Sequence, residues 1–263
     1  MQYRTIEDVL QSSSAATLRD RKDNTVKHII AIGGGGLAVA PDGLLLEQYI
    51  LAQSGKARPA VCFLPNASAD PGEYSLRFYA ALSQLDCRLS HLSLFAPPSA
   101  DLASFLLEKD VIYVGGGNTK SMLALWREWG LVEILRHAYE RGIILCGVSA
   151  GAICWFEQGL TDSIPGPYTV LPCAGFLRGS CSPHYDGEAQ RRPQFHELLL
   201  QGAIQPGHAV EDGAALHFVD GELHAVVTSR PTAKAYYVEK QDQGVSERAL
   251  GTQYLGADTP PQA

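Results

Sequence analysis

The sequence has 263 residues, of which 46% are hydrophobic and 19% charged, a composition typical of a globular protein with a sizeable core. The formal net charge is −7 and no basic block is present, so the usual electrostatic basis for binding nucleic acid is absent. The chain lacks a run of apolar residues long enough to cross a bilayer or to act as a secretory signal, so we expect a cytoplasmic protein without a membrane partner.

Short apolar runs alternate with longer amphipathic runs up to about residue 158. This alternation predicts strand and helix in turn, and the continuous apolar character of the strands favours a parallel sheet covered on both faces. The predicted strands lie within 28–35, 60–68, 87–95, 111–117 and 143–151. The predicted helices lie within 42–55, 72–86, 100–110 and 118–142, the last broken or kinked near Gly130.

The pattern changes in the C-terminal part of the chain. Residues 159–188 are rich in Gly, Pro and Ser, and a helix is predicted over 189–201. Residues 209–229 then predict short strands joined by Asp-Gly turns, and 234–240 a last edge strand. We therefore expect an α/β fold with a mostly parallel sheet flanked by helices and with C-terminal antiparallel strands.

The domain organisation follows from these elements. We expect a polar N-terminal extension over 1–26, a single α/β domain over 27–250 and a disordered tail over 251–263.

Two glycine clusters follow predicted strands. In "IGGGGLA", no helix begins beside the glycines and no acidic residue follows about 20 residues later, so a tight turn is favoured over a dinucleotide site. "VGGGNT" (115–119 after Val114) ends one strand and opens a helix, with Asn118 and Thr119 as candidate caps. Its backbone N–H groups could face a ligand at the carboxyl edge of the sheet.

Ser149 lies in "GVSAG", between a predicted strand and a predicted helix. G-x-S-x-G in this context is the nucleophile-elbow pattern, in which small neighbours make room for a serine on a strained turn. A serine nucleophile needs a base. Of the eight histidines, His184 in "CSPHYDGE" is the best candidate, because it lies in a loop of small and turn-forming residues after Pro183.

"VGGGNT", "GVSAGA" and "SPHYDGE", together with "IIAIGGGG", resemble peptidase family S51 in that order over about residues 27–235. This family contains dipeptidase E and cyanophycinase, and the segment after Ser149 is more similar to the peptidase-E-like branch. The resemblance implies a three-layer fold like that of class I glutamine amidotransferases. It also implies a serine hydrolase acting on aspartyl peptide bonds, without a metal or organic cofactor.

The resemblance assigns roles to particular residues. Ser149 would be the nucleophile and His184 the base; the N–H groups of Gly116 and Ala150 would bind the oxyanion, with Asn118 beside the substrate. Asp162 is the expected third member of the triad. The remaining candidate acids are Asp186, Glu188, Glu211 and Asp212. Candidate cations for a substrate carboxylate are Arg178, Arg191 and Arg192.

Several alternatives stay open at this stage. One is a cysteine hydrolase of the amidotransferase type using Cys146 or Cys154. Another is a catalytically silent or differently specific relative that binds a small ligand. The others are a cyanophycinase-like β-aspartyl peptidase and an esterase of the α/β-hydrolase type. The sequence also leaves open whether the protein forms a homodimer.

Overall fold

The computed structural model describes residues 25–37, 44–70 and 72–256. The helices in this part are α2 (Leu45–Ala52), α3 (Gly72–Leu82), α4 (Leu102–Leu107), α5 (Thr119–Glu128), α6 (Leu131–Glu140), α7 (Ala150–Ile153) and α8 (Arg191–Leu200), with a 3₁₀ turn, η1 (Asn66–Ser68). The first strands are β1 (His28–Ile32), β2 (Ala60–Leu64), β3 (Arg88–His91), β4 (Val111–Val114), β5 (Ile144–Val148), β6 (Phe156–Thr161) and β7 (Thr169–Pro172). They are followed by β8 (Leu177–Ser182), β9 (Gly207–Val210), β10 (Ala214–Val219), β11 (Glu222–Thr228), β12 (Ala235–Gln241), β13 (Gly244–Ala249) and β14 (Gln253–Tyr254).

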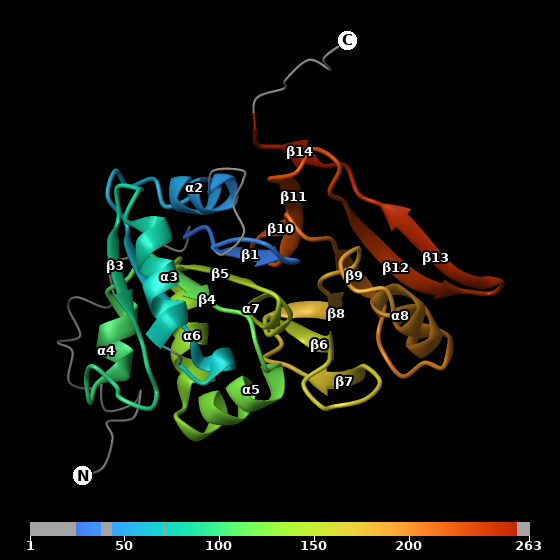
Figure 1. Ribbon diagram of the computed structural model, residues 1–263, viewed down its shortest axis with the longest axis horizontal. Coiled ribbons are helices and arrows are strands. Elements are labelled where there is room, and N and C mark those ends of the chain that lie inside the picture. Colours follow the sequence, from blue (N-terminus) through green and yellow to red (C-terminus); the bar gives the residue numbers. More distant parts are fainter. Residues whose placement is uncertain (1–24, 38–43, 71, 257–263) are drawn as a thin grey trace.

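The main sheet has eight strands in the order β14-β11-β10-β1-β5-β4-β2-β3 (Figure 1). Strands β1 to β5 pair in parallel, whereas β10 and β11 join as an antiparallel hairpin beside β1. This arrangement confirms the predicted α/β fold with a mostly parallel sheet and later antiparallel strands. The parallel strands bring their carboxyl ends to a single edge, where the two glycine clusters and Ser149 follow β1, β4 and β5.

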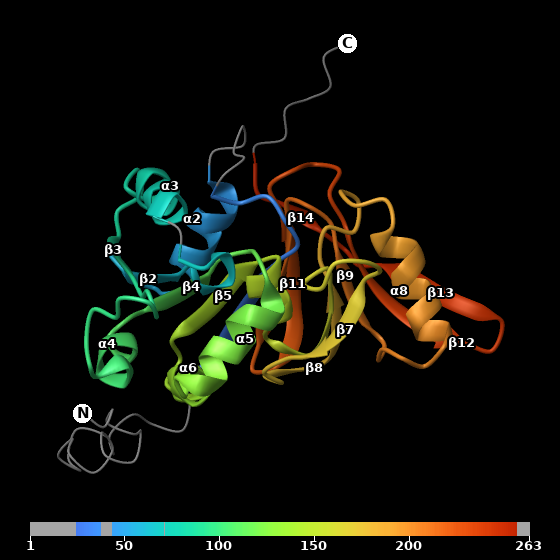
Figure 2. The ribbon, with the colours of Figure 1, turned by 60° about the horizontal axis from the view of Figure 1, so that its bottom comes forward.

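Helices cover both faces of the main sheet, which explains why its central strands are apolar throughout. Ile29 and Ala31 of β1 belong to one core cluster, which includes residues of α4, α5 and α6. Ile30 and Ile32 belong to a second cluster, which includes residues of α2 and α3. Figure 2 shows α2 and α3 on one side of the sheet and α5 and α6 on the other. The predicted break near Gly130 separates α5 from α6, and Gly130 has a φ of 62°.

A second sheet of six strands, in the order β13-β12-β9-β8-β6-β7, lies beside the first (Figure 1). Strands β7 and β8 were not predicted, because they lie within the Gly-, Pro- and Ser-rich segment. The strand predicted at 234–240 is β12, but it is not an edge strand, because it pairs with both β9 and β13. Helix α8 contacts β12 and β13.

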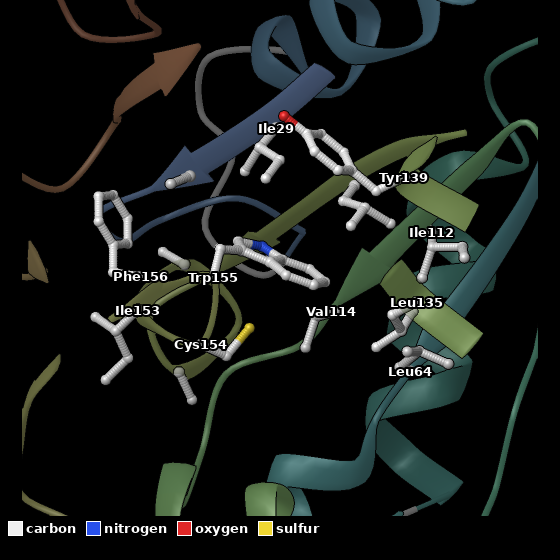
Figure 3. Close-up of a cluster of buried hydrophobic side chains, with 14 of the residues drawn as sticks. Ile29, Leu64, Ile112, Val114, Leu135, Tyr139, Ile153, Cys154, Trp155 and Phe156 are labelled. Atoms are coloured by element: carbon white, nitrogen blue, oxygen red, sulfur yellow. The ribbon is translucent and has the colours of Figure 1, made fainter. Parts of the chain in front are cut away.

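The segment after Ser149 is embedded in the main core. Figure 3 shows Ile153, Cys154, Trp155 and Phe156 among the side chains of the surrounding strands and helices. All four are at most 2% exposed, and the Trp155 ring centroid lies 6.0 Å from that of Trp126. This packing fixes the short helix α7, and with it the turn at Ser149.

The ends of the chain are only partly described. Residues 253–254 form β14 and pair with β11, so they are ordered, although the sequence predicted disorder from residue 251. The rest of that predicted tail, 257–263, and residues 1–24 of the predicted extension lie outside the described residues. None of the described helices combines the length and the apolar character needed to cross a membrane.

Candidate active site

Ser149 occupies a sharp turn between β5 and α7. Its φ of 57° and ψ of −111° are strained for a residue with a side chain. A Cβ at Gly147 would lie 2.6 Å from the carbonyl oxygen of Val114, and a Cβ at Gly151 would overlap the same oxygen. Both flanking positions therefore require glycine, for the steric reason that the sequence pattern suggested.

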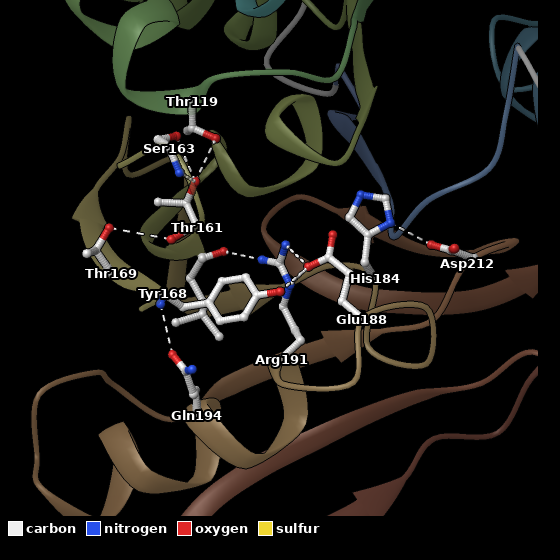
Figure 4. A network of polar contacts seen from close by, with 11 residues as sticks. Thr119, Thr161, Ser163, Tyr168, Thr169, His184, Glu188, Arg191, Gln194 and Asp212 are labelled. Atoms are coloured by element: carbon white, nitrogen blue, oxygen red, sulfur yellow. Dashed lines mark hydrogen bonds and ion pairs between the residues drawn. The ribbon is translucent and has the colours of Figure 1, made fainter. Parts of the chain in front are cut away.

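His184 lies between β8 and α8 and also has a positive φ, 51°. Its Nδ1 is 2.7 Å from Oδ1 of Asp212, and Figure 4 shows this pair at the side of a wider polar network. The side chains of His184 and Asp212 are 24% and 33% exposed, so a ligand can reach the pair.

The end of β1 brings Ser149 and His184 together. The N–H of Ser149 donates to the carbonyl of Ile32 at 3.0 Å, and the N–H of His184 donates to the carbonyl of Gly33 at 3.3 Å. The carbonyls of two consecutive residues thus hold the Ser149 turn and the His184 loop next to the end of β1. Across the described residues no hydrogen bond joins the side chains of Ser149 and His184.

The backbone of Asp212 is held by an ion pair between Asp186 and Arg230. Its N–H donates to Oδ1 of Asp186 at 2.8 Å, and Oδ2 of Asp186 pairs with Arg230 at 2.7 Å. Burial opposes ionisation of Asp186, but the hydrogen bonds from Arg230 and from the Asp212 N–H outweigh it and lower its pKa. An anionic Asp186 therefore anchors the backbone that presents Asp212 to His184.

The acid expected at Asp162 does not hold this position. Asp162 is exposed and follows β6, and no hydrogen bond to His184 is found for it in the described part of the chain. Asp212 pairs with the imidazole instead. On the chain beside His184, Figure 4 shows Arg191 donating to the carbonyl of Leu160 and to Glu188, whose N–H donates to the carbonyl of His184.

The other candidate acids are committed elsewhere. Glu188 accepts from Arg191 and from the hydroxyl of Tyr168. Glu211 is 9% exposed and accepts from the N–H of Lys234 and the hydroxyl of Tyr236. Asp212 was one of several candidates in the sequence, and no local motif distinguishes it from Glu211.

The expected oxyanion donors lie next to Ser149. A Cβ at Gly116 would lie 3.4 Å from Cβ and 3.9 Å from Oγ of Ser149. Ala150 begins α7, so its N–H has no acceptor within the helix. The N–H of Gly116 donates to the hydroxyl of Tyr74 at 3.1 Å, a contact that the sequence did not reveal.

Both the oxygen and the nitrogen of the Asn118 side-chain amide form hydrogen bonds within the fold. Its side-chain oxygen caps α5 by accepting from the N–H of Ser121, and its Nδ2 donates to the carbonyl of Ser163. The predicted cap is therefore confirmed. Asn118 fixes the loop after β4 against the segment after β6.

The cysteine alternative does not fit the structure. Cys146 and Cys154 are fully buried, and burial raises the pKa of each thiol well above its ordinary value. A nucleophilic cysteine needs an accessible, acidified thiol. Within the described ranges no cluster of His, Cys, Asp and Glu could hold a metal ion.

Most of the arginines expected to hold a substrate carboxylate already have carboxylate partners. Arg191 is 2% exposed and pairs with Glu188, and Arg192 pairs with Glu247. Arg178 is exposed on β8.

The glycines after β1 make room for the His184–Asp212 pair. Gly34 forms an isolated parallel β-bridge with Asp212. A Cβ on Gly34 would overlap both Oδ1 of Asp212 and Nδ1 of His184. Gly35 and Gly36 have φ of 77° and 70°, so the tight turn favoured by the sequence is present.

We expect Gly34→Ala to separate Asp212 from His184 and to lower kcat/KM by about 10³-fold, because the imidazole loses its orienting partner. Steady-state kinetics on a small peptide and the melting temperature measure the effect. Gly251→Ala is the matched control, since a Cβ there meets open space. Unchanged kinetics of Gly34→Ala would show that the pair is not needed for turnover.

Known proteins resemble this chain in sequence and in fold. The profile of peptidase family S51 matches residues 29–226. The chain is 55% identical over 231 residues to the uncharacterized peptidase YgaJ of Bacillus subtilis, covering 88% of this chain and 100% of that protein. It is 26% identical to peptidase E of Haemophilus influenzae, covering 73% of this chain and 88% of the relative.

Two solved structures share the fold. A peptidase from an acI-B1 actinobacterium superposes with a TM-score of 0.65 at 15% identity, covering 86% of this chain and 95% of the other. A putative peptidase E from Listeria monocytogenes gives 0.57 at 18% identity, covering 79% and 100%. The profile match covers most of the chain and includes Ser149 and His184, and so the chain belongs to peptidase family S51.

Proposed function

We propose that this protein is a serine peptidase of the dipeptidase E type that uses Ser149, His184 and Asp212 as its triad. The observation that carries the proposal is the 2.7 Å contact between His184 and Asp212, anchored to the same strand end as the strained turn of Ser149. Asp212 takes the role that the sequence assigned to Asp162.

The proposed reaction is acyl transfer. With its Nδ1–H donated to Asp212, the imidazole of His184 presents Nε2 as the base that accepts the proton of Ser149 during attack on the substrate carbonyl. Such hydrogen bonds often form fully only with substrate bound, which is compatible with the absence of a Ser149–His184 bond among the described residues. His184 then protonates the leaving amine, and water releases the acyl group by the reverse route.

Positioned donors stabilise the charge that develops on the carbonyl oxygen. The N–H of Ala150 and the neighbourhood of Gly116 flank Ser149, and each such donor lowers the barrier by about 3 kcal/mol. Apart from the substrate and water, the proposed steps use side-chain and backbone groups of this chain.

The substrate class in this proposal is small aspartyl peptides, and it rests on the family resemblance. The paired state of Arg191 and Arg192 lends it no support, because a substrate carboxylate would have to displace Glu188 or Glu247. Turnover of Asp-X, Glu-X and β-Asp-X dipeptides distinguishes this preference from a cyanophycinase-like one.

A fluorophosphonate probe tests the serine mechanism without knowledge of the substrate. We expect one covalent adduct, mapped to Ser149 by peptide mass spectrometry, because only an activated serine attacks the phosphorus. Iodoacetamide is the control and should leave activity intact, since the thiols nearest the site are buried. A catalytically silent protein would give no adduct, and inactivation by iodoacetamide would indicate a cysteine enzyme.

A further inference from the structure

The hydroxyl of Tyr74 accepts a hydrogen bond from one of the two backbone N–H groups expected to bind the oxyanion. Tyr74 lies in the first turn of α3, and its hydroxyl oxygen accepts the N–H of Gly116 at 3.1 Å. Gly116 is the residue whose added Cβ would lie 3.9 Å from Oγ of Ser149. In the free protein this N–H is therefore already donated to the tyrosine hydroxyl.

Packing holds the tyrosine ring in this place. The ring meets Phe63 edge-on at 5.1 Å, and a Cβ on Gly115 would lie 2.8 Å from Cε1 of Tyr74. Phe78 of the same helix stacks on Phe63 at 4.6 Å, which anchors α3 against the sheet. The absence of a side chain at Gly115 is what lets the ring approach.

The hydroxyl still has a proton to give. Burial raises the pKa of Tyr74 above its ordinary value, although the Gly116 hydrogen bond and Arg77 act in the opposite direction, so the phenol is neutral at physiological pH. Among the described residues none accepts a hydrogen bond from this O–H. The hydroxyl oxygen accepts the N–H of Gly116, whereas the O–H proton is not donated to any described residue.

We propose that Tyr74 is a catalytic residue that donates its O–H to the substrate oxyanion and relays the hydrogen bond of Gly116. This inference rests on the proposed serine mechanism. The oxyanion hole then consists of Ala150 N–H and Tyr74 O–H. Accepting the Gly116 N–H polarises the phenol and strengthens its own donation. The proton stays on Tyr74 throughout, so the step is a hydrogen bond and not a proton transfer.

The test is the second-order rate of fluorophosphonate labelling, because the phosphonyl oxygen enters the oxyanion hole. We expect Tyr74→Phe to slow labelling, and kcat on a small peptide, by about 100-fold while KM and the melting temperature stay close to wild type. The phenylalanine ring keeps the packing on Phe63 and Gly115. Tyr79→Phe is the matched control, since its hydroxyl lies on the same helix and contacts His91 instead.

The outcomes separate this inference from the proposed function. An unchanged or faster rate in Tyr74→Phe would mean that the hydroxyl only stands in for the oxyanion in the free protein, which overturns the proposal. Labelling that persists in Ser149→Ala would instead remove the serine mechanism, and the role of Tyr74 with it.

A fluorinated tyrosine at position 74 gives a second readout that does not depend on removing the hydroxyl. Its more acidic phenol loses the donated proton at lower pH. The alkaline limb of the labelling rate should therefore move to lower pH than in wild type. An unmoved limb would contradict donation by Tyr74.

Discussion

Ser149→Ala is expected to lower kcat/KM on the best substrate of a dipeptide panel by about 10⁶-fold, the scale seen when a triad serine is removed. Oγ of Ser149 is the atom that forms the acyl bond, and alanine leaves the turn without a nucleophile. Alanine occupies the same backbone turn, with its N–H still donated to Ile32, so binding should change little. Steady-state kinetics and a peptide-binding titration measure the two effects.

Ser182→Ala is the matched control for this prediction. Ser182 is buried and precedes His184 by two residues, and its hydroxyl has no hydrogen-bond partner among the described residues. Removing that hydroxyl should leave kcat/KM within a few-fold of wild type. Equal turnover by wild type and Ser149→Ala would exclude the serine from the reaction.

The main sheet could be predicted from the sequence because the patterns that determine its strands and helices lie within short segments. Strands such as β2 and β5 are buried along their whole length, and each reads as a continuous apolar run between amphipathic helices. Gly130 marks a helix break because its left-handed backbone cannot continue α5. These signals need no knowledge of distant parts of the chain.

Apart from β12, most of the second sheet could not be predicted in the same way, because distant contacts select its residues. A Cβ at Gly207 of β9 would overlap the carbonyl oxygen of Ser180 in β8, and a Cβ at Gly159 of β6 would lie 3.0 Å from Ile153. Small residues here allow one strand to approach another strand, or a helix, closely. In the sequence the same small residues indicate loops.

The site residues likewise fall into those set by a local sequence pattern and those set by distant contacts. The turn at Ser149 and the glycines around it form one local pattern, so the sequence identified them. Asp212 lies 28 residues beyond His184, at the start of the turn into β10, and reaches the imidazole because Gly34 pairs with it across the end of β1. Tyr74 depends in the same way on the packing of α3 against β2 and β4. No spacing in the sequence encodes either contact.

The assignment of the acid gives the most discriminating prediction. Asp212→Asn is expected to lower kcat by about 10⁴-fold at neutral pH, because an amide at this position favours the wrong tautomer of His184 and leaves the developing imidazolium unpaired. The shape of the side chain is unchanged, so Gly34 and Asp186 keep their contacts and the fold should be retained. Steady-state kinetics, with the melting temperature as a check on folding, measure the effect.

Asp162→Asn is the matched control, because it makes the same chemical change on the acid that the sequence favoured. Asp162 is exposed, and among the described residues it has no hydrogen bond to His184, so kcat should stay within a few-fold of wild type. The reverse result, with Asp162→Asn inactive and Asp212→Asn active, would require His184 to turn away from Asp212 when substrate binds. The two carboxylates thus predict opposite outcomes, and one pair of variants distinguishes an acid held by the end of β1 from one supplied by the segment after β6.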